Sequence, residues 1–363
     1  MKVFMYDAVP NFGDMLNKYI WAKYFGKFID RDDGILMFGI GTVLGEDTGG
    51  AVSVIVCGSG CGYSRRIREI DSKLFKFFFV RGKMTEKILG LPEGTAITDP
   101  GILTPECFPP APRGERVVFV PHWESASNPL WRIACERAGV DYVDPLGDIN
   151  EIMKALSSAR LVIAEAMHGA IVADSYRTPW KAVTTSERIN RFKWTDWAGS
   201  LDMVPHFHTF APLGPSDFFR TLTSSKDKEI GLEEIDRNSK GTLDEVKADE
   251  KKGQGGAKSA LKTLYKLIVP AFIRNRKDDF LNHRLGPFLD RMMAVLVRAG
   301  LPSRAMKRTV YELQVLSSQE GAQLSDEAVS KKRVAQIHDR LVDVREFLEK
   351  ADQQRAESKK RSV

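Results

Sequence analysis

The sequence predicts an α/β fold of two Rossmann-like domains followed by a helical C-terminal extension, and three observations support this. Short apolar runs alternate with helix-like stretches along the first part of the chain, a pattern typical of parallel sheets. A proline-rich connection divides this pattern in two, and a charged, glycine-containing stretch ends it. The expected parts are an N-terminal α/β domain at 1–112, a second α/β domain at 113–223, a flexible linker at 224–257 and a basic helical region at 258–363.

The first domain is expected to contain strands and helices in alternation. The apolar runs 52–56 and 74–80 are typical of buried strands. The stretches 14–25 and 84–89 are helix-like. This order predicts a largely parallel sheet with helices packed on it.

The second domain repeats the alternation. It starts with a predicted strand at 117–120, a helix near 129–138 and a short strand at 142–143. Asp148, with Glu151 three residues later, predicts the start of the next helix because the pair resembles a capping box. Two α/β domains that face a cleft, as in GT-B glycosyltransferases, fit this order.

Beyond the linker, apolar residues recur near helical spacing, and Pro270, Pro287 and Pro302 divide the region. The last segment, 325–354, has apolar residues close to a seven-residue repeat. We expect this segment to be a helix that packs on the protein, since it is short for a coiled coil. Pairing with a partner helix is the alternative.

The basic charge of the chain is concentrated in one segment. The whole sequence has 54 Lys and Arg against 48 Asp and Glu, whereas residues 257–310 have 12 basic residues against 3 acidic ones. One interpretation is a peripheral contact of 257–310 with the inner face of the cytoplasmic membrane. The other is that these helices pack on the catalytic domains with their basic face in water. Nucleic acid is not expected, because no nucleic-acid-binding motif accompanies the charge.

The chain is expected to be cytoplasmic. Its beginning lacks the pattern of a secretory signal, and no run approaches the roughly 18 apolar residues of a membrane-spanning helix. The four cysteines are irregularly spaced and are expected to be reduced thiols. No Cys and His set has the spacing of a zinc site, so no metal is expected.

His168 is the first candidate for chemistry. It follows the predicted buried strand 161–164 and precedes a run of small residues that predicts a helix. In open α/β sheets, the turn after a strand lies at the edge where ligands bind. An imidazole there is a candidate acid or base, and the alternative is a structural turn histidine.

Several motifs occur in a fixed order along the chain. They are Asn11-Phe12-Gly13-Asp14, Val80-Arg81-Gly82-Lys83-Met84-Thr85, Thr98-Asp99-Pro100-Gly101 and Glu165-Ala166-Met167-His168-Gly169, together with 38–45, 56–63 and 193–197. This ordered set resembles the polysaccharide pyruvyltransferases, in particular the succinoglycan-type branch of bacterial exopolysaccharide biosynthesis, over roughly residues 1–213. One position departs from the family, because Ala166 stands where many members have an arginine.

The resemblance implies a reaction. A pyruvyl group would pass from phosphoenolpyruvate to two hydroxyls of a sugar, forming a cyclic ketal and releasing phosphate, with no cofactor. Such a reaction needs a proton donor and cations for a carboxylate and a phosphate. We assign His168 as general acid and Arg81 as a bidentate anion contact. His122 is a second candidate for a phosphate or hydroxyl contact, and a capped turn histidine is its alternative.

The remaining expected substrate contacts lie in the same motifs. They are Asn11, Gly13, Asp14, Gly58, Ser59, Gly60, Glu165 and Lys193. Asp14 could accept a sugar hydroxyl or cap the following helix, and capping is favoured. The expected acceptor is a lipid-linked oligosaccharide. Two alternatives remain open: a nucleotide-sugar-dependent GT-B glycosyltransferase, and a catalytically inactive scaffold of exopolysaccharide assembly.

Overall fold

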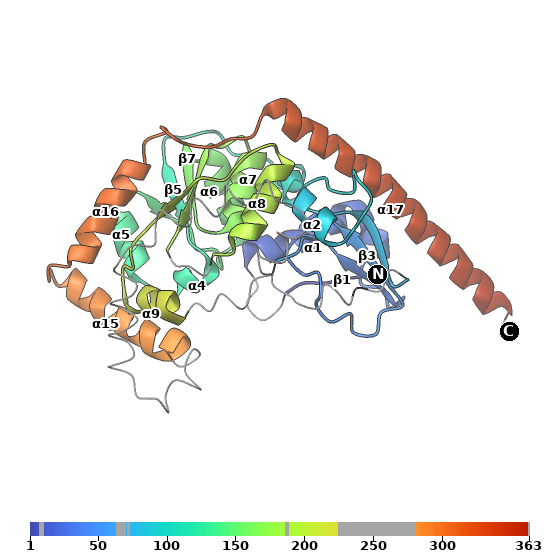
Figure 1. Cartoon of the computed structure of the whole chain (residues 1–363), viewed down its shortest axis with the longest axis horizontal. Coiled ribbons are helices and arrows are strands. Elements are labelled where there is room, and N and C mark those ends of the chain that lie inside the picture. Colours follow the sequence, from blue (N-terminus) through green and yellow to red (C-terminus); the bar gives the residue numbers. More distant parts are fainter. Residues whose placement is uncertain (7–10, 63–69, 71–72, 186–188, 224–280, 362–363) are drawn as a thin grey trace.

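Two parallel β-sheets with helices packed around them form the body of the protein (Figure 1). The computed structural model describes residues 1–6, 11–62, 70, 73–185, 189–223 and 281–361. The predicted α/β fold with a helical C-terminal region is confirmed at this level. The predicted linker, 224–257, lies outside the described residues, and so does the part of the basic segment before residue 281.

The first sheet has four parallel strands in sequence order: β1 (Lys2–Val3), β2 (Ile35–Phe38), β3 (Ser53–Cys57) and β4 (Phe75–Phe79). The apolar runs predicted as strands correspond to β3 and β4. The helices of this half are α1 (Phe12–Phe25), α2 (Lys83–Ile88) and α3 (Thr104–Cys107), with a 3₁₀ turn, η3 (Pro100–Leu103), before α3. The predicted helices correspond to α1 and α2, with boundaries that differ by one or two residues.

The second sheet has five parallel strands in the order β6-β5-β7-β8-β9. They are β5 (Val117–Val120), β6 (Asp141–Tyr142), β7 (Leu161–Ala164), β8 (Trp180–Thr184) and β9 (Phe207–Thr209). The helices are α4 (Trp123–Ala126), α5 (Leu130–Ala138), α6 (Ile149–Ser158), α7 (Met167–Ser175), α8 (Arg191–Ser200) and α9 (Pro215–Thr223). The side chain of Asp148 caps α6 as predicted, because it accepts hydrogen bonds from the backbone amides of Asn150 and Glu151.

Strand order reverses within the second sheet. β5 lies between β6 and β7, so the chain moves first to one side of β5 and then to the other. Such a reversal leaves a crevice at the carboxyl ends of the two central strands, and ligands of open α/β sheets bind there. This topology directs attention to the residues that follow β5 and β7.

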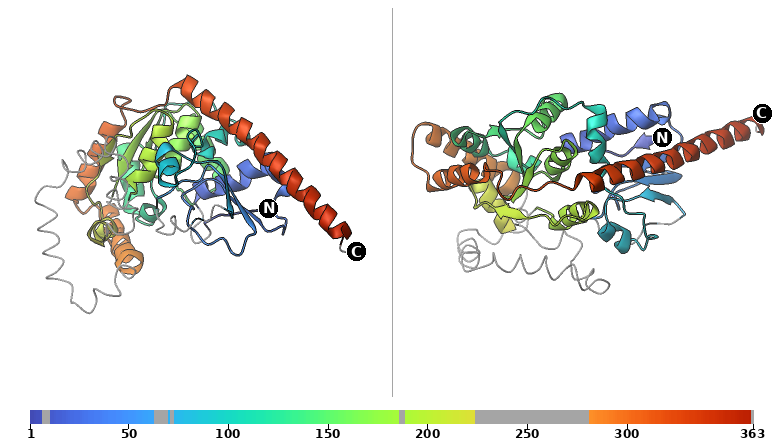
Figure 2. Two further views of the ribbon diagram at one scale, coloured as in Figure 1. Left: turned by 45° about the vertical axis from the view of Figure 1, so that its right-hand side comes forward. Right: turned by 90° about the horizontal axis from the view of Figure 1, so that it is seen from above.

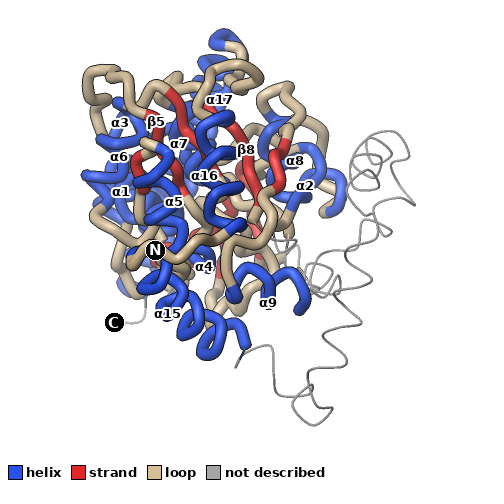
Figure 3. The backbone as a smooth tube through the Cα atoms, turned by 90° about the vertical axis from the view of Figure 1, so that its left-hand side faces the viewer, coloured by secondary structure: helices blue, strands red, loops and turns tan. Residues whose placement is uncertain are grey.

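The C-terminal helices return to both halves of the molecule. A π-helical turn, η5 (Leu281–Leu285), leads into α15 (Gly286–Arg298), and α16 (Arg304–Leu316) follows. α15 packs against α9, and α16 packs against α5, so both lie at the end of the second sheet's domain (Figure 3). No helix among the described residues combines the length and apolar character that crossing a bilayer requires.

The last helix, α17 (Glu327–Arg361), runs along the first domain (Figure 2). Its apolar residues Ile337, Val344 and Leu348 are buried, and the Phe347 ring lies 5.9 Å from the Phe78 ring, measured between centroids. The near-heptad spacing therefore corresponds to a helix that packs on the protein, as expected, although the helix extends beyond the predicted end at residue 354.

A buried ion pair fastens the two domains to each other. The Nε of Arg81, which follows β4, lies 3.1 Å from the Oδ2 of Asp196 on α8, and both side chains are 0% exposed. Asp196 also accepts hydrogen bonds from the backbone amides of Met84 and Thr85 at the start of α2. α8 belongs to the second half of the sequence, so these bonds fix it against the first domain.

We expect Arg81→Ala to lower the free energy of unfolding by about 3–5 kcal/mol, because the variant leaves the buried Asp196 carboxylate without its counter-ion. Urea unfolding followed by circular dichroism measures this loss. Arg116→Ala is the control, since the Arg116 side chain is 76% exposed where it pairs with Asp141. It should cost less than about 1 kcal/mol. Equal losses of stability in the two variants would contradict the proposed role of the buried Arg81–Asp196 pair.

A buried carboxylate fastens α15 to α9. The Asp290 Oδ1 accepts a hydrogen bond from the backbone amide of Ser216, in the first turn of α9. Burial is the main cause that raises the pKa of Asp290 to about 6, and the neighbouring Asp217 adds to this effect, while Arg220 opposes it. The folded protein therefore holds a poorly solvated charge above this pH.

The sign of the pH dependence follows from this shift. Because the folded-state pKa of Asp290 exceeds the unfolded value of 3.8, its contribution to stability is full at low pH and is lost as pH rises through about 6. We expect Asp290→Asn to be more stable than the unsubstituted chain at neutral pH, by on the order of 2 kcal/mol. The difference should vanish below about pH 4. Thermal unfolding across this range tests it, and a difference independent of pH would refute it.

Candidate functional site

The candidate site lies where the two domains meet, at the carboxyl ends of β5 and β7. His122 directly follows Pro121 after β5, and His168 lies in the first turn of α7, three residues after Glu165, the first residue beyond β7. The sequence prediction placed His168 in a turn before the helix. The structure starts α7 at Met167, so the imidazole projects from the first turn of the helix instead.

His168 faces a buried aspartate of the first domain. Its Nε2 lies 3.8 Å from the Oδ2 of Asp99, which is 0% exposed, whereas the His168 side chain is 14% exposed. Neither atom has a hydrogen-bond partner among the described residues. The other oxygen of Asp99 is fixed, because it accepts a hydrogen bond from the amide of Gly101 and caps η3. Asp99 therefore faces the His168 ring from a fixed position, across a gap that is longer than a hydrogen bond.

The start of α1 forms the opposite wall. Asn11 caps this helix by accepting hydrogen bonds from the amides of Gly13 and Asp14. A Cβ added at Gly13 would overlap the His168 ring, so only glycine permits this approach. The capping role that we favoured for Asp14 falls to Asn11, and the Asp14 side chain instead receives a hydrogen bond from the Asn11 amide group.

Charges from three elements surround Asp14. Burial raises the pKa of its carboxyl group, and the nearby positive charges of His168 and Lys193 oppose part of that rise. Lys193 comes from the first turn of α8, the helix held by the Arg81–Asp196 pair. The site thus brings a carboxyl group together with an imidazole and an ammonium group that both lie more than 150 residues later in the sequence.

His122 lies at the edge of this group, 21% exposed, with its Nδ1 3.8 Å from the Oε2 of Glu124. Burial, with the positive charges of Lys193 and Arg220, lowers the pKa of His122 to about 3. His122 is therefore neutral at physiological pH. Of the two contacts expected from the sequence, this favours a hydroxyl group over ion pairing with phosphate.

Glu165 connects the loops that follow three strands. Its carboxylate accepts hydrogen bonds from the amide of His122, the hydroxyl of Ser125 and both the amide and hydroxyl of Thr185. The side chain is buried, and burial raises its pKa. We had placed Glu165 among the substrate contacts, but its oxygens are occupied, and it positions the His122 loop instead.

Arg81 also differs from the expected anion contact. Its guanidinium group donates to Asp196, to the hydroxyl of Thr42 and to the carbonyl of Cys61, and the side chain is fully buried. A substrate carboxylate could bind it only by displacing these partners. No local pattern predicts the pairing of Arg81 with Asp196, because the two residues lie 115 positions apart.

The glycine-rich turn after β3 is packed rather than open. Gly58 has φ +93°, and an added Cβ would overlap Pro100. An added Cβ at Gly60 would overlap the guanidinium group of Arg81. Ser59 is 0% exposed, and its hydroxyl donates to the carbonyl of Gly41. These three residues therefore support Arg81 and η3, and the expected substrate contact through them does not follow from the geometry.

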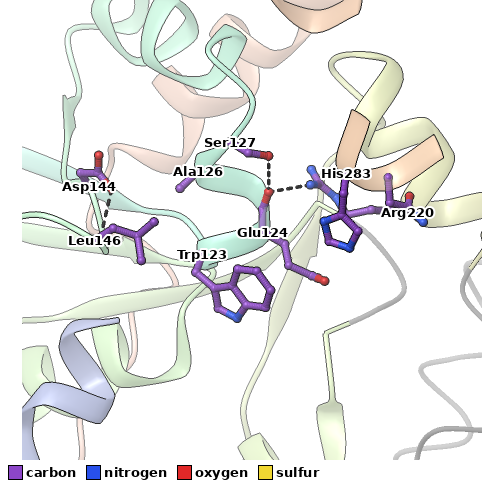
Figure 4. A pocket seen from close by; sticks show the side chains of 9 residues that line it. Trp123, Glu124, Ala126, Ser127, Asp144, Leu146, Arg220 and His283 are labelled. Atoms are coloured by element: carbon purple, nitrogen blue, oxygen red, sulfur yellow. Dashed lines mark hydrogen bonds between the residues drawn. The ribbon is translucent and has the colours of Figure 1, made fainter. Parts of the chain in front are cut away.

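A cavity of about 240 Å³ opens beside Trp123, the residue that follows His122, and sequence reasoning did not find it (Figure 4). Its lining comes from α4, from the loop after β6, from α9 and from η5: Trp123, Glu124, Ala126, Ser127, Asp144, Leu146, Arg220, Asn282 and His283. Asn282 and His283 belong to the C-terminal region, so that region contributes to a cavity next to the strand ends. Among the described residues, no three His, Cys, Asp or Glu side chains cluster as a metal site.

Comparison with known proteins gives two matches for the region that carries these residues. Residues 11–187 match the family model described as polysaccharide pyruvyl transferase. The chain is also 39% identical over 199 residues to the succinoglycan biosynthesis protein ExoV of Rhizobium meliloti (strain 1021). That alignment covers 53% of this chain and 62% of the relative, so the chain spans less than two thirds of the length of the curated relative it matches. The resemblance drawn from the sequence motifs is confirmed.

We expect Gly13→Ala to disturb the site, because its methyl group would push the His168 ring away from α1. The overlap should cost about 1–3 kcal/mol of stability and move the NMR signals of the His168 ring. Gly26→Ala, at the other end of α1, is the matched control, since an added Cβ there meets nothing within 4 Å. That variant should be neutral or slightly stabilising. If both variants behaved alike, the close approach of Gly13 would be refuted.

Proposed function

We propose that this chain, whose residues 11–187 match the polysaccharide pyruvyl transferase family model, transfers the pyruvyl group of phosphoenolpyruvate to a sugar of an exopolysaccharide repeat unit as a cyclic ketal. The observation that carries the proposal is the Asp99–His168 pair, whose facing atoms are buried and have no hydrogen-bond partner. Paired groups of this kind, at the carboxyl end of a central strand, are suited to moving a proton.

The reaction balances without a cofactor. Two C–O bonds form between sugar oxygens and the enol carbon, one C–H bond forms at the methylene carbon, and the C–O bond to phosphate breaks. One hydroxyl proton ends on the new methyl group and the other on the released phosphate. The protein must therefore supply a proton donor, a proton acceptor and positive charge near the two anionic groups.

The residues at the domain junction match these requirements. His168, which faces Asp99, would donate the proton to the methylene carbon. Asp14 would accept a hydroxyl proton, because burial raises its pKa and makes its carboxylate a better base. Lys193 would provide positive charge for the phosphate or the carboxylate, in a member of the family that has Ala166 in place of the common arginine.

The acceptor sugar would bind in the cavity beside His122. The Trp123 ring offers an apolar face for a sugar ring, and the carboxylate of Glu124 also lines the cavity, where it could accept a hydrogen bond from a sugar hydroxyl group. Neutral His122 lies between this cavity and the charged group around Lys193. On this reading the two domains are Rossmann-like and face a shared cleft, as in the GT-B arrangement, with donor and acceptor sites side by side. A lipid-linked oligosaccharide on the cytoplasmic side of the membrane is the acceptor that fits this proposal.

The proposal is tested by phosphate release from phosphoenolpyruvate in the presence of lipid-linked oligosaccharides, with mass spectrometry of the product. We expect His168→Gln to lose on the order of 10² to 10⁴ in turnover, because it removes the proton donor. The control is His206→Gln, which changes an exposed histidine of the same domain and should leave turnover unchanged. Release of a nucleoside diphosphate, with phosphoenolpyruvate left intact, would instead identify a glycosyltransferase.

The same assay separates the roles of the pair. Asp99 is a positioning residue in this mechanism, since it would act on the substrate only through His168. Asp99→Asn should therefore lower kcat and leave the KM for phosphoenolpyruvate unchanged, because Asp99 does not touch the substrate. A variant in which the KM rises as well would limit Asp99 to capping η3.

A further inference from the structure

α15 exposes a continuous apolar stripe. Phe288, Met292, Val295 and Leu296 are between 45% and 67% exposed. At about 100° per residue, these four positions fall within roughly 100° of the helix circumference. Leu301, just beyond the end of the helix, is 52% exposed and extends the apolar surface. Isolated apolar residues are normal on a protein surface, but a stripe along one helix marks an interaction site.

The charge beside the stripe has one sign. Residues 281–311 contain five arginines and one lysine against a single acid, Asp290. Asp290 is buried against α9, so its carboxylate does not face the stripe. Arg284, Arg291 and Arg298 recur every seven residues and lie beside the stripe by the same helical spacing. All three are exposed, and none forms an ion pair with another described residue.

The opposite face of α15 is fixed to the protein. Ala294 and Val297 are buried in the core that contains Trp131 of α5. The guanidinium group of Arg137 donates to the carbonyl of Val297, and Asp290 holds the start of α9. α15 therefore presents its stripe as a rigid edge of the molecule, at the end of the second domain (Figure 1).

We propose that α15 binds an anionic membrane surface, with its apolar stripe in the headgroup and acyl boundary and its arginines on the lipid phosphates. An amphipathic helix of this composition binds an interface by burying apolar area and by attraction to anionic lipid. Charge complementarity favours an anionic membrane over a second copy of the chain as the binding partner, because two copies facing each other would bring their arginine side chains together.

This orientation has a geometric consequence for the cavity beside His122. η5, which contributes Asn282 and His283 to the cavity wall, continues directly into α15. Contact of α15 with a membrane would place the cavity close to the lipid surface. The binding itself does not depend on the proposed reaction, and it is measured without any substrate.

Flotation of the full chain with lipid vesicles tests the proposal. We expect the chain to float with vesicles that contain about one-third phosphatidylglycerol in phosphatidylcholine, and to stay at the bottom with phosphatidylcholine alone. High salt should reduce binding, because it screens the arginines. Phe288→Ser with Val295→Ser, and Arg291→Glu with Arg298→Glu, should each lower the bound fraction at least about tenfold.

Matched control variants distinguish binding through α15 from non-specific binding through other exposed apolar or basic residues. Val52→Ser with Val342→Ser changes equally exposed apolar residues elsewhere, and Lys83→Glu with Lys87→Glu makes the same charge change on α2. Both should float like the unsubstituted chain. Circular dichroism confirms that each variant is folded.

Three results would overturn the proposal. The first is an unsubstituted chain that stays unbound at low salt, and the second is a Phe288→Ser and Val295→Ser variant that floats normally. The third is an unbound chain that light scattering shows to be a dimer dissociated by that variant. It would assign the stripe to a second copy of the chain.

Discussion

The candidate site depends on the buried Arg81–Asp196 pair, because the site is assembled from two sheets that no strand connects. Asp14 and Asp99 come from the first domain, whereas His168 and Lys193 come from the second. The pair fixes α8, which carries Lys193, against the start of α2.

Two further hydrogen bonds act at the same junction, from the side chain of Asn190 to the carbonyl of Gly62 and from the hydroxyl of Ser200 to the hydroxyl of Thr98. A buried ion pair of this kind contributes little net stability over an apolar contact of the same shape, but it tolerates almost no displacement. A proton-transfer site needs its groups held in close alignment, and the buried ion pair provides this alignment.

α17 adds a second and physically different connection between the domains. Near its start, Arg333 donates to the carbonyl of Ser200 at the end of α8, and further along its apolar residues lie on the first domain. Its exposed ion pairs with the first domain, such as Arg31 with Asp352, are weak individually. Its buried residues Ile337, Val344 and Leu348 provide most of the attachment through apolar burial. The two connections have different roles. The Arg81–Asp196 pair sets the geometry at the site through short polar contacts, whereas α17 holds the domains together through apolar burial along its length.

Local sequence patterns predicted the features that depend on interactions between residues close together in the chain. The strands β3, β4, β5 and β7, the capping of α6 by Asp148 and the family motifs all depend on residues that are neighbours in the chain. The predicted site residues Asn11, Gly13, Asp14, His122, His168 and Lys193 do lie around one junction. Arg81 and Glu165 were assigned to substrate because an exposed and a buried charge have the same letter in a sequence, and only tertiary structure supplies Asp196 or Thr185 as a partner. Asp99 lies in one of the family motifs, but the sequence did not predict it as a site residue. Its unpaired oxygen faces an imidazole 69 positions away, and no local pattern shows this.

The position of α17 in the chain also bears on how the protein is made. β4 and α17 are in contact, yet about 250 residues separate them, and at typical rates of synthesis of about 5–20 residues per second they leave the ribosome roughly 10–50 s apart. During that interval the first domain can form its sheet, but the apolar surface around Phe78 has no cover. A nascent chain in this state exposes the kind of surface that chaperones bind and that drives aggregation. The nascent first domain must therefore wait for α17 before this apolar surface is covered.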